Sequence, residues 1–325
     1  MSATPSQAES GDVAVDAYAH VGLPRFQSVE DYWALAGPVG VGRAVLCAFD
    51  SSPDLRTLHT AVRADPGRHR ALGVPFGDDR PARAASVRAQ LDAGFSGIRL
   101  ADRDLTDARD ELVATGELGG IAVVCAEATS LEAGAAVLLA HLERFPDAAV
   151  VGGHFASPRD PAVLDGGAVG ELFRHPRFHV VFSRQGAFTA ATLLEWAHAV
   201  VETTGWERIL WGSESPVLLW RNETIADALH WIERLSPSDA ERTAFLSGNA
   251  GRLFFGAEAL TGPLELPADP WETAPRFPAT LWARGLPVDQ ELAGRLIHSW
   301  LSAPDRPETF GDFVARILSG SIPPV

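Results

Sequence analysis

The chain has 325 residues, 46% hydrophobic and 21% charged, which favours one large domain with an appendage over two equal domains. Its formal net charge of -15 argues against a general affinity for nucleic acid or acidic membranes, because both need a positive surface. All 27 basic residues are arginine, and the absence of lysine excludes Schiff-base chemistry, a lysine general base and a carboxylated lysine that bridges two metals.

Residues 1–12 are small and polar and predict a loose tail rather than a signal peptide. No apolar run approaches the roughly 20 residues of a membrane span, so we expect a cytoplasmic protein. Cys47 and Cys125 each lie near the end of an apolar run. Two such cysteines indicate buried strand thiols and not a disulfide framework.

Short apolar runs alternate with longer helical patterns through residue 256, which is typical of repeated βα units. The candidate strands are 12–18, 42–49, 70–76, 96–100, 120–127, 148–155, 178–183 and 208–215, and helical patterns include 29–40, 52–66, 82–94, 130–146, 190–205 and 225–236. Eight such units predict a (β/α)8 TIM-like barrel over residues 13–256. The alternative is an open doubly wound sheet, which would usually need a glycine-rich phosphate turn after the first strand, and 18–24 is not one.

Residues 257–325 differ in composition from the rest of the chain. A proline-rich connector at 263–287 should run extended over a surface, and short helical patterns follow at 289–303 and 308–320. Their apolar stripes predict helices that pack on the barrel or on a partner subunit. A lid over the barrel mouth or a homodimer contact is the alternative.

The active site of a TIM-like barrel lies at the carboxyl ends of its strands. Polar residues at those ends are therefore the candidate functional residues. They are Tyr18 and His20, Asp50, Asp78, Arg99 and Asp102, Glu127, His154, Ser183 and Arg184, and Glu214.

The first strand places Asp16, Tyr18 and His20 on one face, because side chains alternate along a strand. Imidazole is a common metal ligand, whereas a neutral phenol is a poor ligand and a good hydrogen-bond donor. We therefore expect Tyr18 to polarise a carbonyl oxygen. Glu214, after the last strand, could ligate a metal or act as a general base toward water. The alternative for Glu214 is a loop carboxylate held by an arginine.

Arg99 at the end of the fourth strand could bind a substrate carboxylate, or could pair with Asp102 or Glu127 instead. A histidine such as His154 at a strand end is more often structural, and only its expected convergence with His20 and Glu214 favours catalysis. Further candidates for contacts to substrate are Ser183, Arg184 and Glu127, the last depending on the register of its strand.

Four motifs carry a family resemblance. The first is an Asp-x-His-x-His strand end, to which Asp16, Tyr18 and His20 correspond. The second is a segment of Phe-Pro-Asp, an apolar strand and a histidine, which matches residues 144–158. The third, Trp-Gly-Ser-Asp-x-Pro, matches residues 207–217, and the fourth, a closing Gly-Asn-Ala-x-Arg-Leu-Phe helix, matches residues 246–254. Residues 13–256 thus resemble the amidohydrolase-related family, in its amidohydrolase-2 branch. They are closest to the lactonase group that includes 2-pyrone-4,6-dicarboxylate lactonase and fuconolactonase-like proteins. Two positions depart from the pattern, since Tyr18 replaces a histidine and Glu214 an aspartate.

The resemblance implies a hydrolase of a small, anionic lactone or ester. Glu214 would be the base, His154 and His20 would orient water or stabilise the oxyanion, Tyr18 would donate to it, and Arg99 would anchor an anionic group. A metal is not favoured; if one binds, it would be a single zinc or manganese ion on His20, His154 and Glu214. The alternatives are a metal-dependent non-oxidative decarboxylase and a non-catalytic barrel that binds a small molecule or a partner.

Overall fold

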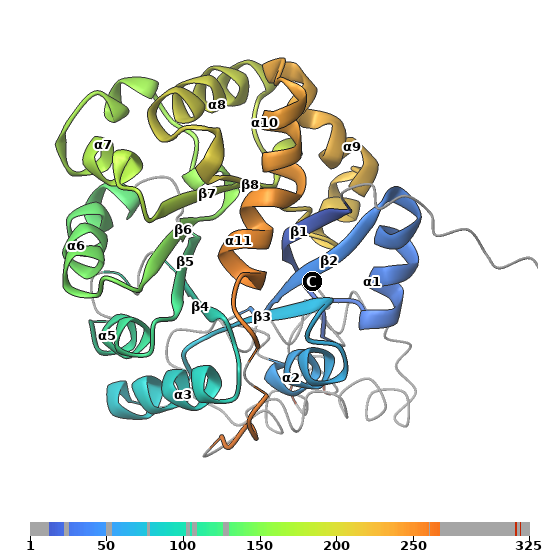
Figure 1. Ribbon diagram of the computed structural model, residues 1–325, viewed down its shortest axis with the longest axis vertical. Helices are drawn as coiled ribbons and strands as arrows, with labels where there is room; N and C mark the ends of the chain where they lie inside the picture. Colours follow the sequence, from blue (N-terminus) through green and yellow to red (C-terminus); the bar gives the residue numbers. More distant parts are fainter. Residues whose placement is uncertain are drawn as a thin grey trace, which may run out of the picture.

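The computed structural model describes residues 13–22, 26–49, 54–76, 79–101, 105, 109–125, 130–259 and 261–266, together with 316 and 319. Its parallel strands lie side by side in sequence order, β1 to β8 (Figure 1). The strands are β1 (Ala14–Ala19), β2 (Val41–Cys47), β3 (His69–Gly73), β4 (Gly97–Ala101), β5 (Ile121–Cys125), β6 (Ala149–Gly152), β7 (Phe178–Phe182) and β8 (Ile209–Trp211). The predicted (β/α)8 architecture is confirmed.

Most helices surround the strands and cover their outer face, and the last one lies across an end of the barrel (Figure 1). They are α1 (Val29–Ala36), α2 (Leu55–Ala64), α3 (Arg80–Asp92), α5 (Arg109–Glu117), α6 (Ser130–Arg144), α7 (Gly167–Arg174), α8 (Ala190–Thr204), α9 (Ile225–His230), α10 (Asp239–Thr243) and α11 (Asn249–Phe255). Several begin at a side chain that accepts a hydrogen bond from the first turn, as Ser28, Asp54 and Asp79 do for α1, α2 and α3. These caps explain why the helix of segment 52–66 begins at Leu55.

The last strand meets the first and nearly closes the barrel. The Glu214 amide donates to the Tyr18 carbonyl at 2.8 Å, and the His20 amide donates to the Ser215 carbonyl at 2.7 Å. A Cβ on Gly212 would lie only 2.8 Å from Cβ of Tyr18, so this close approach requires glycine. The sequential strand order and this closure rule out the open doubly wound alternative.

The core has two layers. One lies between the strands and the helices, and the other fills the barrel interior with inward side chains such as Val45, Val123 and Leu210. Phe254 of α11 belongs to the inner layer, and the Arg70 side chain of β3 donates to its carbonyl oxygen. Because Arg70 lies near the amino end of its strand, α11 covers the end of the barrel opposite the strands' carboxyl ends.

Some element ends differ from the prediction. Segment 208–215 is a strand only over Ile209–Trp211, because the Ser213 amide donates to the Asp16 carboxylate and leaves the strand ladder. Segment 225–236 is an α-helix only to His230 and continues as the 3-10 turn Trp231–Leu235. Within the described ranges, none of the helices is both long and apolar enough to cross a membrane. The tail 1–12 and almost all of 267–325 lie outside the described residues.

Candidate active site

The carboxyl ends of the strands bring together most of the predicted site residues. Tyr18 lies in β1, Arg99 in β4, and His154 and Glu214 follow β6 and β8. His20 follows β1, and Ser183 and Arg184 follow β7. All of them are buried except Arg184, which is partly exposed. Asp50, Asp78, Asp102 and Glu127 lie outside the described residues, so their predictions stay untested.

Glu214 is the centre of a charged cluster. Its Oε1 lies 3.6 Å from Nε2 of His154 and 3.3 Å from Nε of Arg184, while its Oε2 lies 2.9 Å from Nη2 of Arg221. The Glu214 side chain is 4% exposed, against 41% for Arg184 and 19% for Arg221. The arginine contacts are those of the alternative considered for Glu214, a loop carboxylate held by arginine, and they come from more exposed side chains.

Glu214 has a pKa above the usual range of a glutamate, because burial disfavours its ionised form. The positive charges of Arg184 and Arg221 act in the opposite direction and limit that rise. A carboxylate with a moderately raised pKa is a stronger base than an ordinary glutamate and is still ionised at a pH above that value.

His154 is held on both sides of its ring. Its Nδ1 lies 2.9 Å from Oγ of Ser183, and its Nε2 faces Glu214. Burial holds the pKa of His154 well below the usual range of histidine, and the nearby Arg184 and Arg99 charges lower it further. His154 is therefore neutral near pH 7, when its ring has one nitrogen donor and one acceptor.

The three residues of this cluster that follow β6, β7 and β8 share an uncommon backbone conformation. The φ angles are 54° at His154, 67° at Arg184 and 58° at Glu214, and residues 155–157 continue the left-handed run after His154. Each such residue costs roughly 1–2 kcal/mol relative to a right-handed conformation. Strain of this kind concentrates at functional sites, where it fixes the direction of a side chain.

Tyr18 lies deeper in the barrel and contacts Arg99. Nε of Arg99 donates to the Tyr18 hydroxyl at 2.8 Å, and that hydroxyl lies 3.1 Å from Sγ of Cys125. The Arg99 guanidinium also lies over the Phe49 ring, 4.5 Å from its centroid. Burial raises the pKa of Tyr18 well above the usual value, so the phenol stays protonated. The hydroxyl thus helps to fix Arg99, and its predicted donation to a substrate oxygen stays a prediction.

His20 completes the inner wall of the site. Its Nδ1 lies 2.8 Å from the Cys47 carbonyl oxygen, which can only accept, so Nδ1 carries the proton. Its ring stacks on Phe26 with centroids 4.7 Å apart. Both cysteines, Cys47 and Cys125, are free and buried, as the sequence predicted.

The side chains present do not fit a metal ion. The Tyr18 ring packs edge to face against both His20 and His154, at 5.1 and 5.2 Å between centroids, while two guanidinium groups occupy the oxygens of Glu214. Guanidinium groups at a carboxylate repel a divalent cation. In the part of the chain that the structure describes, no group of three or more His, Cys, Asp or Glu side chains is arranged to hold a metal.

Arg221 is a site residue that sequence reasoning missed. It ends the 3-10 turn Val217–Arg221 and also binds Glu223, with Nε 2.5 Å from Oε1. Its signal in the sequence was weak, since an arginine seven positions after Glu214 reaches the carboxylate only if the loop folds back.

Comparison with known proteins identifies the family. The family model described as amidohydrolase matches residues 3–256. A structure assigned as a 2-pyrone-4,6-dicarboxylic acid hydrolase from Pseudomonas putida shares 24% identity and covers 75% of this chain and 98% of its own, with a TM-score of 0.59. A comparable assignment from Acinetobacter baumannii shares 17% identity and covers 75% and 99%, with a TM-score of 0.59.

A third structure, a dihydroxybenzoic acid decarboxylase from Polaromonas sp. with bound manganese, shares 15% identity and covers 75% and 97%, with a TM-score of 0.57. Identities this low show the shared fold and not the reaction. Comparison with curated proteins gave no match. Because the family model spans most of the sequence, the chain belongs to the amidohydrolase family.

Proposed function

We propose that the chain hydrolyses a small, anionic lactone or ester in the site at Glu214. The observation that carries the proposal is the cluster of Glu214, neutral His154 and two arginines at the barrel mouth. A buried carboxylate with a raised pKa is suited to accept a proton from water. The 2-pyrone-4,6-dicarboxylic acid hydrolases of the same fold act, by their names, on a dianionic substrate of this kind.

In the proposed reaction, Glu214 accepts a proton from a water molecule as the water oxygen attacks the carbonyl carbon of the lactone. The bond between that carbon and the ring oxygen then breaks, and the ring oxygen takes up the proton that Glu214 accepted, so one lactone and one water give one hydroxy acid and Glu214 is ionised again. His154 lies close enough to Glu214 to orient the water through Nε2. His20, on the other side of Tyr18, is proposed to orient a water molecule through its unprotonated Nε2, since its Nδ1 donates to the Cys47 carbonyl.

Positive side chains supply the attraction for an anionic substrate. Arg99 is fixed by Tyr18 and Phe49 and is proposed to bind a carboxylate of the substrate. Arg184, whose side chain is 41% exposed, is proposed to contact substrate at the rim of the site. Preorganised donors in a buried pocket lower the barrier by several kcal/mol without a metal.

The test is a hydrolysis screen over lactones and esters that includes 2-pyrone-4,6-dicarboxylate. We expect Glu214→Gln to lower kcat by about a hundredfold or more, and His154→Ala by about tenfold or more. Glu207→Gln is the matched control, because the Glu207 side chain is 68% exposed and pairs with Arg208 instead of the residues at Glu214. If Glu214→Gln and His154→Ala leave a discovered activity intact, the assignment is wrong.

Two further measurements test the alternatives, which are a metal-dependent decarboxylase and a non-catalytic barrel. Since decarboxylases share the fold, release of carbon dioxide from 2,6-dihydroxybenzoate only with added zinc or manganese would favour a metal-dependent decarboxylase. Ligands that raise the melting temperature with no turnover would favour a non-catalytic barrel. For the proposed hydrolase, we expect activity to survive removal of divalent metals with a chelator, measured together with the metal content per chain.

A further inference from the structure

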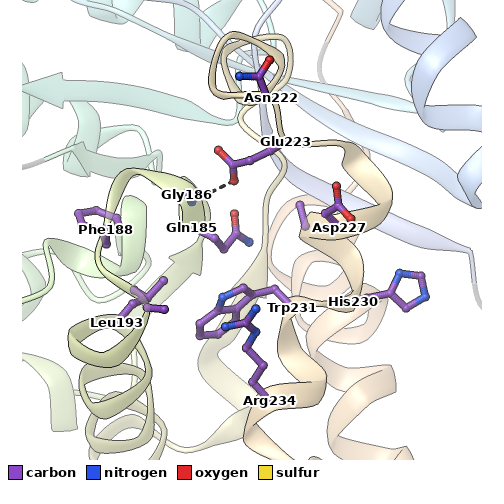
Figure 2. A pocket seen from close by; sticks show the side chains of 12 residues that line it. Gln185, Gly186, Phe188, Leu193, Asn222, Glu223, Asp227, His230, Trp231 and Arg234 are labelled. Atoms are coloured by element: carbon purple, nitrogen blue, oxygen red, sulfur yellow. Dashed lines mark hydrogen bonds between the residues drawn. The ribbon is translucent and has the colours of Figure 1, made fainter.

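A cavity of about 500 Å³ adjoins the loops that carry Arg184 and Arg221. It is formed by the loop after β7, the start of α8 and the segment from Asn222 to Arg234 (Figure 2). The two sites share the same loops, since Gln185 follows Arg184 and Glu223 lies two positions after Arg221. Glu223 lines the cavity and binds Arg221, which in turn contacts Glu214. The volume lies within the range of small-molecule pockets.

Gln185 is the polar group that points to a ligand. The residue is only 7% exposed, yet its Nε2 is buried without a hydrogen-bond partner. Figure 2 shows its carboxamide in the cavity, between Glu223 and Trp231. A buried amide that lacks partners destabilises the fold, and native structures rarely keep one. A ligand whose amide oxygen accepts a hydrogen bond would satisfy Nε2.

The remaining walls set the shape and charge of that ligand. Trp231, Phe188 and Leu193 supply aromatic and aliphatic surface, on which a flat ring can pack. Glu223 and Asp227 place two carboxylates at the cavity, against the single guanidinium of Arg234. Both carboxylates already accept hydrogen bonds from the chain, Glu223 from the Gly186 amide and Asp227 from Thr224. Glu223 is also paired with Arg221 at 2.5 Å, so the charges around the cavity nearly balance, which favours an uncharged ligand.

We propose that this cavity is a second small-molecule site, which binds an uncharged aromatic or conjugated ring that bears a carboxamide or lactam group. The ring packs against Trp231, and the amide of the ligand pairs with the amide of Gln185. This site goes beyond the proposed hydrolysis and does not depend on it.

The test uses 4-fluorobenzamide as the probe and ligand-observed fluorine NMR as the measurement. We expect saturable binding to the full chain, and binding at least about tenfold weaker for 4-fluorobenzoate, which has the same ring and a negative charge. Gln185→Leu should weaken 4-fluorobenzamide binding by about tenfold, because it removes the amide pair and keeps the size. Ala190→Trp should abolish binding by filling the cavity from the exposed start of α8.

Glu214→Gln is the control that separates the two sites. It should leave probe binding within about twofold of the wild type while it abolishes any hydrolysis. The melting temperature of every variant shows whether the fold is kept. If Gln185→Leu is unstable, Ala190→Trp still tests the cavity, because it changes an exposed residue. Absence of saturable binding to the wild type, or equal binding to Ala190→Trp, would overturn the proposal whether or not the chain hydrolyses lactones.

Discussion

Asp16 and Glu214 are two buried carboxylates on facing elements of the barrel, and their surroundings differ. Asp16 accepts hydrogen bonds from the amides of Tyr18 and Ser213 and from the hydroxyls of Ser213 and Tyr32, at 2.5 to 3.1 Å. Glu214 instead faces two arginine side chains and a neutral histidine, and its Oε2 has no well-directed hydrogen bond.

The difference indicates that Asp16 is a structural carboxylate and that Glu214 is suited to exchange a proton. Asp16 has its hydrogen bonds satisfied by short, fixed groups of the fold, and these bonds tie β1 to the loop after β8. Glu214 has its partners on long arginine side chains, one at each oxygen, and the contact to Oε2 is not a well-directed hydrogen bond. A saturated carboxylate holds structure, whereas a partly satisfied one beside cations can exchange a proton with a bound molecule.

The largest expected effect is on the free energy of unfolding, which should differ between variants of Asp16 and Glu214. Asp16→Ala leaves four buried donors without an acceptor and should lower the free energy of unfolding by about 4 kcal/mol. Glu214→Ala should lower it less, by about 2 kcal/mol, because the Arg184 side chain is 41% exposed and Arg221 keeps its ion pair with Glu223. Urea unfolding at pH 7 measures both. Equal losses in the two variants would contradict this difference in role.

A second effect concerns pH. Burial raises the pKa of Asp16 to about 6, although its four hydrogen bonds act in the opposite direction. The folded chain then binds more protons than the unfolded chain between about pH 4 and pH 6, so the contribution of Asp16 to stability is lost as pH rises through that window. The expected loss is on the order of 3 kcal/mol.

Asp16→Asn is the comparison for this effect, since asparagine does not titrate. The difference in unfolding free energy between wild type and Asp16→Asn should change between pH 4 and pH 7, in favour of the variant at the higher pH. Other titrating groups contribute equally to both chains. A constant difference across this range would mean that Asp16 keeps an ordinary pKa in the fold.

Much of the barrel could be predicted from the sequence, because buried parallel strands are nearly continuous apolar runs. The convergence of His154 and Glu214 followed from strand order alone. The place of Arg221 could not be predicted, since it depends on how an irregular loop folds back. Nor do apolar runs reveal the left-handed backbone after β6, because residues such as Phe155 seldom adopt it.

The third prediction sharpens the role of the arginines at Glu214. Arg221→Met removes one positive charge at 2.9 Å, so the pKa of Glu214 should rise further and the acidic limb of the pH–activity profile should move to higher pH. We expect about a tenfold loss of activity on the acidic limb of the profile and a smaller loss on its plateau. Arg242→Met is the matched control, because Arg242 forms exposed ion pairs with Glu233 and Asp239. An unshifted acidic limb would show that Arg221 does not act on Glu214.

The smallest expected effect tests the hydroxyl of Tyr18. Tyr18→Phe keeps the ring between the two histidines and removes only the hydroxyl that accepts from Arg99. If the hydroxyl positions Arg99, KM for an anionic substrate should rise about fivefold with little change in kcat, because ground-state and transition-state binding are weakened together. If it donates to the oxyanion instead, kcat should fall and KM should stay constant. Tyr32→Phe is the matched control, since Tyr32 donates to Asp16 and should affect stability rather than either constant.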